Sequence, residues 1–437
     1  MLAGSTGQHI AQRAGSGAAQ RSAQKPNTHH LVELLMTSIW LQRALLAALA
    51  CLSLVVEAAP HETLKLDAPK PNLAPTPPMG WNSWNKFACN VSEQLIRQQA
   101  DAMVASGMRA AGYSYLVIDD CWQKSRDADG NIQPDPDRFP SGMKALADYV
   151  HSKGLKFGLY SDAGALTCGG RPGSAGHEFQ DARQYAKWGV DWLKYDWCYT
   201  GPRNPEAAYT IMAKALRESG RDIVLSICEW GSSQPGRWAQ PIGHLWRTTG
   251  DIWDAWKGKK EWSHGLLDII DMNAELWTDA APNGWNDPDM LEVGNGGMTT
   301  AEYESHFSIW AMLAAPLIAG NDMAKMDANT QRILTNADVI RVDQDPLGRQ
   351  GRRIWRQGEL EVWVRTLAGG DRAAVLFNRG EKPADMKVTW DQLDMAPKLK
   401  AEVHDLWSGK KTRGVAGEFG GRVQPHGVLM VRVTPSP

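Results

Sequence analysis

The chain has 437 residues, with 47 Lys and Arg against 49 Asp and Glu, so its formal net charge is −2. This length allows two domains. Because the charge is near neutral and no basic cluster is interleaved with aromatic residues, we expect no nucleic acid as partner. The 20 tryptophans outnumber the 7 phenylalanines. Most should pack in the core, but the excess is also typical of proteins that bind the apolar faces of sugar rings.

An apolar block at residues 44–56 follows Arg43 and precedes Ala58 and Ala59. A basic flank, a short apolar block and small residues at a cleavage site are the pattern of a secretory signal peptide. The block is too short for a confident membrane span. We therefore expect a secreted or otherwise extracytoplasmic protein that does not associate with a membrane after cleavage. A lipoprotein anchored through Cys51 is the alternative.

Five cysteines follow the apolar block. In a secreted chain this number suggests two disulfides and one free thiol. The chain contains no CxxC or HxxH spacing, so we expect neither a metal ion nor another cofactor.

Short apolar runs rich in β-forming residues recur from residue 79 to about residue 345. Helical patterns lie between them, at residues 92–106, 142–152, 179–188, 205–219 and 300–313. Eight strand–helix units in a segment of this size predict a (β/α)₈ TIM barrel. A doubly wound open sheet is the alternative, but no glycine-rich phosphate loop follows the first strand. The eight strands are expected to begin near Met79, Tyr115, Lys156, Asp191, Ile223, His244, Gly284 and Ala315.

Beyond residue 345 the pattern changes to alternating apolar and polar residues, punctuated by Gly, Asp and Pro. This alternation predicts a small antiparallel β domain, most simply a sandwich. Six strands are expected, around residues 354–356, 360–365, 372–378, 386–390, 402–407 and 427–433. The predicted division of the chain is an extension at 1–35 (disordered, or untranslated if Met36 is the start), a signal peptide at 36–59, a Pro-rich lead-in at 60–75, the barrel at 76–345 and the β domain at 346–437.

Acidic residues stand where the predicted parallel strands end, and in a barrel these ends meet at one face. Several carboxylates so close together would repel one another, although Lys194 and Arg247 at the same ends would offset part of the repulsion. Hydrolysis of a glycosidic bond needs two such groups, one to protonate the leaving oxygen and one to attack or to activate water. The acidic residues at strand ends are Asp119, Asp120, Asp162, Asp196, Glu229, Asp251, Asp287 and Asp289.

The adjacent Asp119 and Asp120 allow a second interpretation, since paired carboxylates can hold Ca²⁺ or Mg²⁺. Their neighbours are aromatic residues and cysteine rather than further oxygen ligands. We therefore favour two acceptors for the hydroxyl groups of a sugar.

Six motifs occur in a fixed order: Pro78-Met79-Gly80-Trp81-Asn82-Ser83-Trp84, Ile118-Asp119-Asp120-Cys121-Trp122, Lys194-Tyr195-Asp196-Trp197-Cys198, Cys228-Glu229-Trp230-Gly231, Gly284-Trp285-Asn286-Asp287-Pro288-Asp289-Met290 and Gln344-Asp345-Pro346-Leu347-Gly348. With them the chain closely resembles the melibiase family of retaining α-galactosidases, over roughly residues 75–437. The resemblance implies that Asp196 is the nucleophile and that Asp251 is the acid/base. It also implies a pocket for one terminal sugar lined by Trp81, Asp119, Asp120, Tyr160, Lys194, Glu229, Trp230, Arg247, Asp289 and Met290.

The same resemblance implies the disulfides Cys89–Cys121 and Cys168–Cys198. Cys228 would then be a free thiol at the floor of the pocket.

The spacing within the Lys-Tyr-Asp motif adds a physical expectation. Side chains two residues apart on a strand project to the same side, so Lys194 should lie beside Asp196 and lower the pKa of its carboxyl. If the anomeric configuration is retained, the carboxyl groups of Asp196 and Asp251 should lie about 5–5.5 Å apart.

The predicted function is hydrolysis of terminal α-D-galactosyl residues from oligosaccharides, polysaccharides or glycoconjugates through a covalent glycosyl-enzyme. Three alternatives share the scaffold. An α-N-acetylgalactosaminidase would replace the acid at Glu229 with smaller residues, and a β-L-arabinopyranosidase would alter the pair Asp119–Asp120. A sugar-binding lectin would lack Asp196 or Asp251.

Overall fold

The computed structural model describes residue 66 and residues 70–436. The predicted extension, the signal peptide and much of the lead-in lie outside these residues. Within them, none of the helices combines the length and the apolar character that crossing a bilayer requires.

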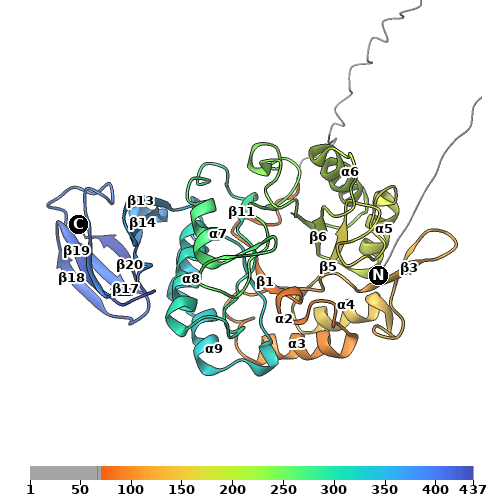
Figure 1. The fold of residues 1–437 in the computed structure, drawn as a ribbon, viewed down its shortest axis with the longest axis horizontal. Coiled ribbons are helices and arrows are strands. Elements are labelled where there is room, and N and C mark those ends of the chain that lie inside the picture. The colour runs from red at the N-terminus through yellow and green to blue at the C-terminus, as the bar shows by residue number, and fades with distance from the viewer. Residues whose placement is uncertain (1–65, 67–69, 437) are drawn as a thin grey trace, which may run out of the picture. The chain divides into compact units, whose positions relative to one another are not determined.

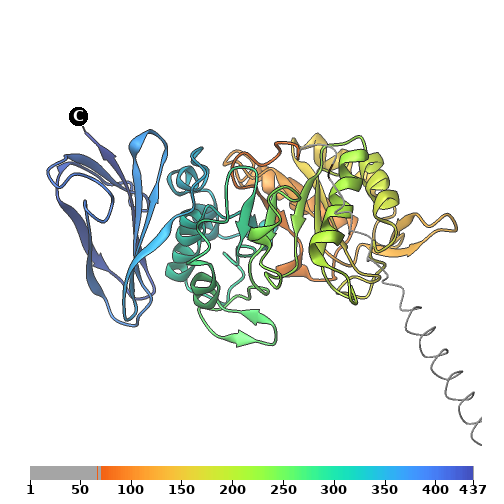
Figure 2. The same ribbon diagram turned by 90° about the horizontal axis from the view of Figure 1, so that it is seen from above.

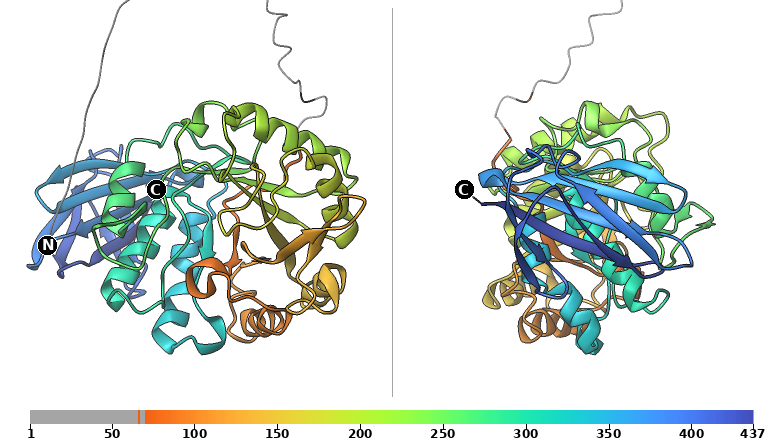
Figure 3. Two further views of the ribbon diagram at one scale, coloured as in Figure 1. Left: turned by 45° about the vertical axis from the view of Figure 1, so that its right-hand side comes forward. Right: turned by 90° about the vertical axis from the view of Figure 1, so that its left-hand side faces the viewer.

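Eight parallel strands form one curled sheet with helices around it (Figures 1 and 3). Their order is β11-β8-β7-β6-β5-β2-β1-β12. Just past β11, the backbone N–H of Leu291 donates to the carbonyl of Ile318 in β12 at 2.8 Å, which brings the two ends of the sheet together. This is the predicted (β/α)₈ barrel rather than an open sheet. All eight predicted strands are present: β1 (Met79–Asn82), β2 (Tyr115–Val117), β5 (Lys156–Asp162), β6 (Trp192–Asp196), β7 (Val224–Ile227), β8 (Leu245–Arg247), β11 (Trp285–Asp287) and β12 (Leu317–Ala319).

Side chains of these strands alternate between two cores, because successive residues of a strand face opposite sides of the sheet. Leu116, Leu193, Leu225 and Trp246 belong to the larger core, which includes the helices. Their strand neighbours form a separate cluster together with Ala74 of the lead-in. That cluster contains Tyr115, Val117, Trp192, Val224, Leu245, Trp285 and Ile318.

The five predicted helices are present, and in two of them the residue just before the helix explains where it starts. The side chain of Asn204 accepts a hydrogen bond from the N–H of Ala207, and Pro205 occupies the first turn of α6. Thr299 and Glu302 form a capping box at the start of α8. Four further helices, α2, α7, α9 and α10, were not predicted. The helices are α2 (Trp84–Phe87), α3 (Glu93–Ala105), α4 (Gly142–Ser152), α5 (Glu178–Trp188), α6 (Pro205–Glu218), α7 (Leu266–Asn273), α8 (Thr300–Leu313), α9 (Ala328–Leu334) and α10 (Ala337–Asp343).

Two short hairpins interrupt the barrel pattern, and neither was predicted. One joins β3 (Gln123–Arg126) to β4 (Ile132–Pro134), and the other joins β9 (Lys259–Lys260) to β10 (Ser263–His264).

The C-terminal part is the predicted antiparallel β-sandwich. A six-stranded sheet, β13-β14-β15-β20-β17-β18, and a two-stranded sheet, β16-β19, share one apolar core. Helix α8 packs against β14, β15 and β20 (Figures 1 and 2). The glycine-rich strands β18 and β19 were not predicted. The strands are β13 (Arg352–Gln357), β14 (Leu360–Thr366), β15 (Arg372–Asn378), β16 (Ala384–Thr389), β17 (Ala401–Asp405), β18 (Lys411–Val415), β19 (Glu418–Val423) and β20 (Val428–Pro435).

Candidate active site

A cavity of about 680 Å³ lies at the carboxyl ends of the barrel strands. Its volume is in the range of small-molecule sites. Seven of the twelve predicted catalytic and sugar-binding residues line it: Asp119, Asp120, Tyr160, Lys194, Asp196, Trp230 and Asp251. The clustering of these side chains follows from the parallel strands, whose carboxyl ends all open at one face.

Asp196 is the last residue of β6, and both of its carboxyl oxygens accept hydrogen bonds. Oδ2 accepts from the hydroxyl of Tyr160 at 2.9 Å, and Oδ1 accepts from the N–H of Trp197 at 2.9 Å. Burial raises the pKa of Asp196 to about 6, and the charge of Lys194 lowers it by less than burial raises it. The predicted net lowering of this pKa is therefore wrong, because desolvation outweighs the ammonium.

Lys194 pairs with Asp119 rather than with the predicted nucleophile. Its Nζ lies 2.9 Å from Oδ2 of Asp119, which also accepts a hydrogen bond from Nδ2 of Asn82 at 2.7 Å. Burial alone would lower the pKa of Lys194, but the charge of Asp119 and other nearby charges raise it well above the usual value. Lys194 is thus a fixed cation that compensates the acidic side of the cavity.

The side chain of Asp120 is held by backbone N–H groups on both oxygens. Oδ1 accepts from Cys121 at 2.6 Å and Oδ2 accepts from Gly169 at 2.6 Å. Burial raises the pKa of Asp120 above its ordinary value. Both oxygens keep further lone pairs that could accept from a ligand hydroxyl.

Asp251 follows β8 and is the more exposed of the two predicted catalytic acids, with 33% of its side chain accessible. Nη2 of Arg247 lies 3.1 Å from its Oδ1 and 2.9 Å from Oδ2 of Asp289. The same Oδ2 of Asp289 accepts a hydrogen bond from the N–H of Ile252 at 2.8 Å. Arg247 and Asp289 therefore hold the segment that carries Asp251.

Three predicted binding residues, Arg247, Asp289 and Met290, do not line the main cavity. They border a separate cavity of about 20 Å³ within the barrel, which Lys194 also borders. All three are buried, so their contact with a sugar remains a prediction.

The other two predicted binding residues that do not line the cavity are Trp81 and Glu229, and both are fully buried. Nε1 of Trp81 donates to the carbonyl of Asn321 at 2.7 Å. Oε2 of Glu229 accepts from the N–H of Ser233 at 2.7 Å, whereas Oε1 has no hydrogen-bond partner within the described part of the chain. Burial raises the pKa of Glu229.

Cys228 has a free, buried thiol, as predicted, but it does not line the main cavity. Its Sγ lies 3.6 Å from Nη1 of Arg247. Burial raises the pKa of this thiol well above its ordinary value, so Cys228 is a neutral neighbour of the arginine.

Seven residues that we did not predict to line the cavity complete its wall: Trp84, Cys168, Trp197, Cys198, Tyr199, Gly250 and Trp262. Trp84, Trp197 and Cys198 lie inside the motifs quoted above, which could have drawn attention to them. Trp262 belongs to the unpredicted β9–β10 hairpin, and no motif pointed to it.

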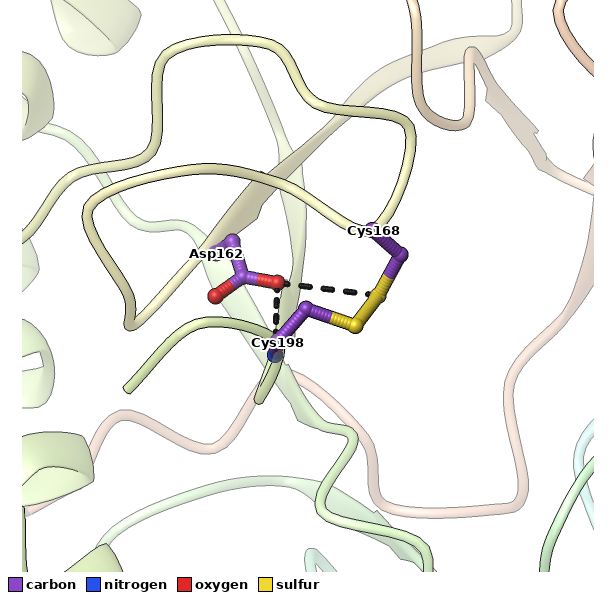
Figure 4. A group of neighbouring side chains, drawn as sticks. All are labelled: Asp162, Cys168 and Cys198. Carbon is purple, nitrogen blue, oxygen red and sulfur yellow. Dashed lines mark hydrogen bonds between the residues drawn. A yellow bond between two sulfur atoms is a disulfide. The ribbon is translucent and has the colours of Figure 1, made fainter. Parts of the chain in front are cut away.

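The two predicted disulfides, Cys89–Cys121 and Cys168–Cys198, are both formed. Asp162 lies beside the second one (Figure 4), where its Oδ2 accepts from the N–H of Cys198 at 3.0 Å. Burial, followed by the charge of Asp196, raises the pKa of Asp162 to about 8. Because both sulfurs of this group are in a disulfide, they are not thiolate ligands for a metal ion.

Comparison with known protein families decides the relationship. Residues 76–345 match the melibiase family segment described as "Alpha galactosidase A", and residues 357–433 match its "Alpha galactosidase C-terminal beta sandwich domain". The chain belongs to the melibiase family. It is 50% identical over 377 residues to a curated relative called "Alpha-galactosidase A" from Cellvibrio japonicus, and the match covers 83% of this chain and 93% of the relative.

Solved structures of the family share the fold. α-Galactosidase I from Mortierella vinacea is 39% identical with a TM-score of 0.81, covering 83% of this chain and 99% of that one. The α-galactosidase of Saccharomyces cerevisiae with raffinose is 30% identical with a TM-score of 0.80, covering 84% and 100%.

Proposed function

We propose that this chain is a retaining exo-α-galactosidase that removes terminal α-D-galactosyl residues from oligosaccharides, polysaccharides or glycoconjugates. Membership of the melibiase family and the names of its relatives support the reaction. The observation that carries the assignment is that Asp196 and Asp251 line one cavity of suitable size. Two carboxyl groups facing one sugar are the requirement for hydrolysis by this route.

In the first step, the carboxylate of Asp196 attacks the anomeric carbon while Asp251 donates its proton to the leaving oxygen. The carbon–oxygen bond to the leaving group breaks, and a covalent galactosyl-enzyme forms. In the second step, Asp251 takes a proton from water, and the water oxygen displaces Asp196. Two inversions at the same carbon retain the configuration of the sugar.

The fixed charges around the two acids suit these roles. The hydroxyl of Tyr160 donates to Asp196 and favours its ionised form. Lys194 and Asp119 neutralise each other in the acidic wall. Asp119 and Asp120 would accept hydrogen bonds from sugar hydroxyl groups.

Three observations argue against the alternatives. The acid at Glu229 is present, which disfavours a 2-acetamido sugar, and the pair Asp119–Asp120 is present, which disfavours a β-L-arabinopyranoside. Asp196 and Asp251 are both present, which disfavours a lectin. Secretion is part of the proposal, because two disulfides are typical of an oxidising compartment.

Hydrolysis of melibiose and of p-nitrophenyl α-galactoside tests the proposal, with the anomeric form of the first galactose product followed by NMR. We expect turnover of both substrates and initial release of α-galactose. Activity confined to α-N-acetylgalactosaminides or β-L-arabinopyranosides would assign one of the alternatives, and initial β-galactose would exclude retention.

A further inference from the structure

Two aromatic side chains in the cavity wall are largely exposed. The exposed fractions are 64% for Tyr199 and 69% for Trp262, and both residues line the cavity. Large aromatic residues normally gain stability from burial. Two that remain accessible at the same cavity point to a surface that a ligand covers.

The backbone that carries Tyr199 is held firmly. Tyr199 has a φ of 49°, in the left-handed region that non-glycine residues rarely adopt. The preceding Cys198 is tied by its disulfide to Cys168 and by its N–H to Oδ2 of Asp162 (Figure 4). A Cβ on Gly164 would lie 1.9 Å from the carbonyl oxygen of Cys198, so only glycine allows this close approach. The loop thus fixes an exposed ring at the cavity.

Trp262 is held near the predicted acid, Asp251, whereas Tyr199 follows the predicted nucleophile in the chain. Trp262 lies in the turn that joins the two strands of the β9–β10 hairpin. This hairpin projects from the barrel as a green pair of arrows in Figure 2. The N–H of His264 donates to the carbonyl of Asp251 at 2.7 Å. A Cβ on Gly250 would lie 2.6 Å from the carbonyl oxygen of Trp262. The hydrogen bond and the close approach together hold the hairpin that carries Trp262 against the segment that carries Asp251.

We propose that Tyr199 and Trp262 form a binding site for the sugar ring of the leaving group. The inference rests on the proposed function and extends it to the substrate class, namely galactosides whose galactosyl unit is linked to another pyranose. In that reaction Asp251 protonates the leaving oxygen, so the leaving group must lie on the side of Asp251, where the hairpin is attached. The apolar face of a pyranose ring matches an exposed indole or phenol ring, which offers contact area at low entropic cost.

The test compares two galactosides that differ only in the leaving group, melibiose with its glucose and methyl α-galactoside with its methyl group. An aryl galactoside is unsuitable, because its aromatic ring could also stack on Trp262. The variants are Trp262→Ala and Tyr199→Ala, together with Trp262→Phe, which retains a ring. Trp277→Ala is the matched control, because Trp277 is 40% exposed and does not line the cavity.

The measured quantity is the ratio of kcat/KM on melibiose to kcat/KM on methyl α-galactoside. We expect Trp262→Ala to lower this ratio about five- to thirty-fold, the effect of losing an aromatic contact residue. Trp262→Phe should recover part of the ratio, and Trp277→Ala should leave it unchanged. If the wild type hydrolyses both galactosides and its ratio is unchanged in Trp262→Ala and in Tyr199→Ala, this inference alone is overturned. A wild type that hydrolyses neither galactoside would overturn the proposed function and this inference with it.

A second measurement uses the glycosyl-enzyme, which partitions between water and an added sugar acceptor. The site that binds the leaving sugar also binds the acceptor, because transfer is the reverse of the first step. With glucose as acceptor, Trp262→Ala should yield less galactosyl-glucose relative to free galactose than the wild type. Unchanged partitioning would contradict the proposed site.

Discussion

Arg247 and Asp289 form an ion pair beneath the cavity, with 2.9 Å between Nη2 and Oδ2 and little exposure of either side chain. The same arginine nitrogen reaches Oδ1 of Asp251, and the same oxygen of Asp289 accepts from the N–H of Ile252. Asp289 therefore restrains Asp251 in two ways, through the arginine and through the next residue of the chain. This geometry favours a positioning role for Asp289 over direct contact with a sugar.

Replacing Asp289 by Asn should weaken acid catalysis more than substrate binding. The amide cannot neutralise Arg247, so the arginine and Asp251 would lose their fixed arrangement. We expect kcat/KM on melibiose to fall roughly tenfold or more, since a general acid contributes factors of about 10²–10⁴. On p-nitrophenyl α-galactoside, whose leaving group needs little protonation, the loss should be clearly smaller. Equal losses on both substrates would contradict the positioning role, and Asp391→Asn, at an exposed position of the β domain, is the control.

The pKa of Asp196 predicts the acid side of the pH profile. This pKa is raised to about 6 by burial, and the nucleophile must be ionised to attack. The protonated fraction of Asp196 therefore grows as the pH falls, and kcat/KM should drop about tenfold for each pH unit below the pKa. A profile on p-nitrophenyl α-galactoside from pH 3 to 8 measures this limb.

Tyr160→Phe provides the matched variant for that profile. It removes the hydrogen bond that lowers the pKa of Asp196, so the acid limb should move to higher pH. A limb that stays in place in this variant would show that Asp196 does not control it.

Much of the fold could be predicted because apolar residues recur along the chain with a clear period. Each barrel strand is a short apolar run with a turn or a helix on either side, and the strand positions followed from those runs. The strands of the β9–β10 hairpin have two residues each, which is too short for a period to be visible. Strands β18 and β19 contain Gly414, Gly420 and Gly421, and glycine is depleted in strands.

The residues that line the cavity were easier to predict than the contacts between them. Acidic residues at strand ends and the ordered motifs pointed to Asp196, Asp251 and their neighbours. The partner of Lys194 could not be read from spacing, since Asp119 reaches it from another strand. Burial of Glu229 behind the wall also depends on packing that no local pattern encodes. The separation of the two catalytic carboxyl groups stays a prediction.

Glu229 should exclude sugars with a 2-acetamido group. Its Oε1 is buried and has no hydrogen-bond partner among the described residues. A 2-hydroxyl that reached this oxygen would donate to it, whereas the wall that covers the acid would keep a bulkier acetamide too far away to do so. An unpaired buried polar group costs about 1–3 kcal/mol. We therefore expect kcat/KM on p-nitrophenyl α-N-acetylgalactosaminide to be at least about fivefold below that on the galactoside. Comparable values for the two substrates would refute this role.

The nucleophile can be identified by rescue. Asp196→Gly should lose nearly all turnover, because no carboxylate remains to attack the anomeric carbon. Added azide should restore part of the activity on p-nitrophenyl α-galactoside by attacking from the vacated face. One inversion then gives β-galactosyl azide, which NMR distinguishes from the α-anomer. Formation of the α-azide by this variant would assign the nucleophile to another residue.

Asp251→Gly should behave in the opposite sense. With p-nitrophenyl α-galactoside, Asp196 can still form the glycosyl-enzyme, because the leaving group departs with little protonation. The intermediate should accumulate, since no base remains to activate water. Azide needs no base and should intercept the intermediate to give the α-azide, because two inversions retain configuration.

Melibiose supplies the complementary result for the same variant. Its glucose leaving group needs a proton, so Asp251→Gly should hydrolyse it very slowly with or without azide. Unimpaired hydrolysis of melibiose would move the acid elsewhere. Asp289 is a poor substitute, because its Oδ2 is bound to Arg247 and Ile252 beneath the cavity. Asp120 would then be the first residue to replace, since it lines the cavity and burial raises the pKa of its carboxyl.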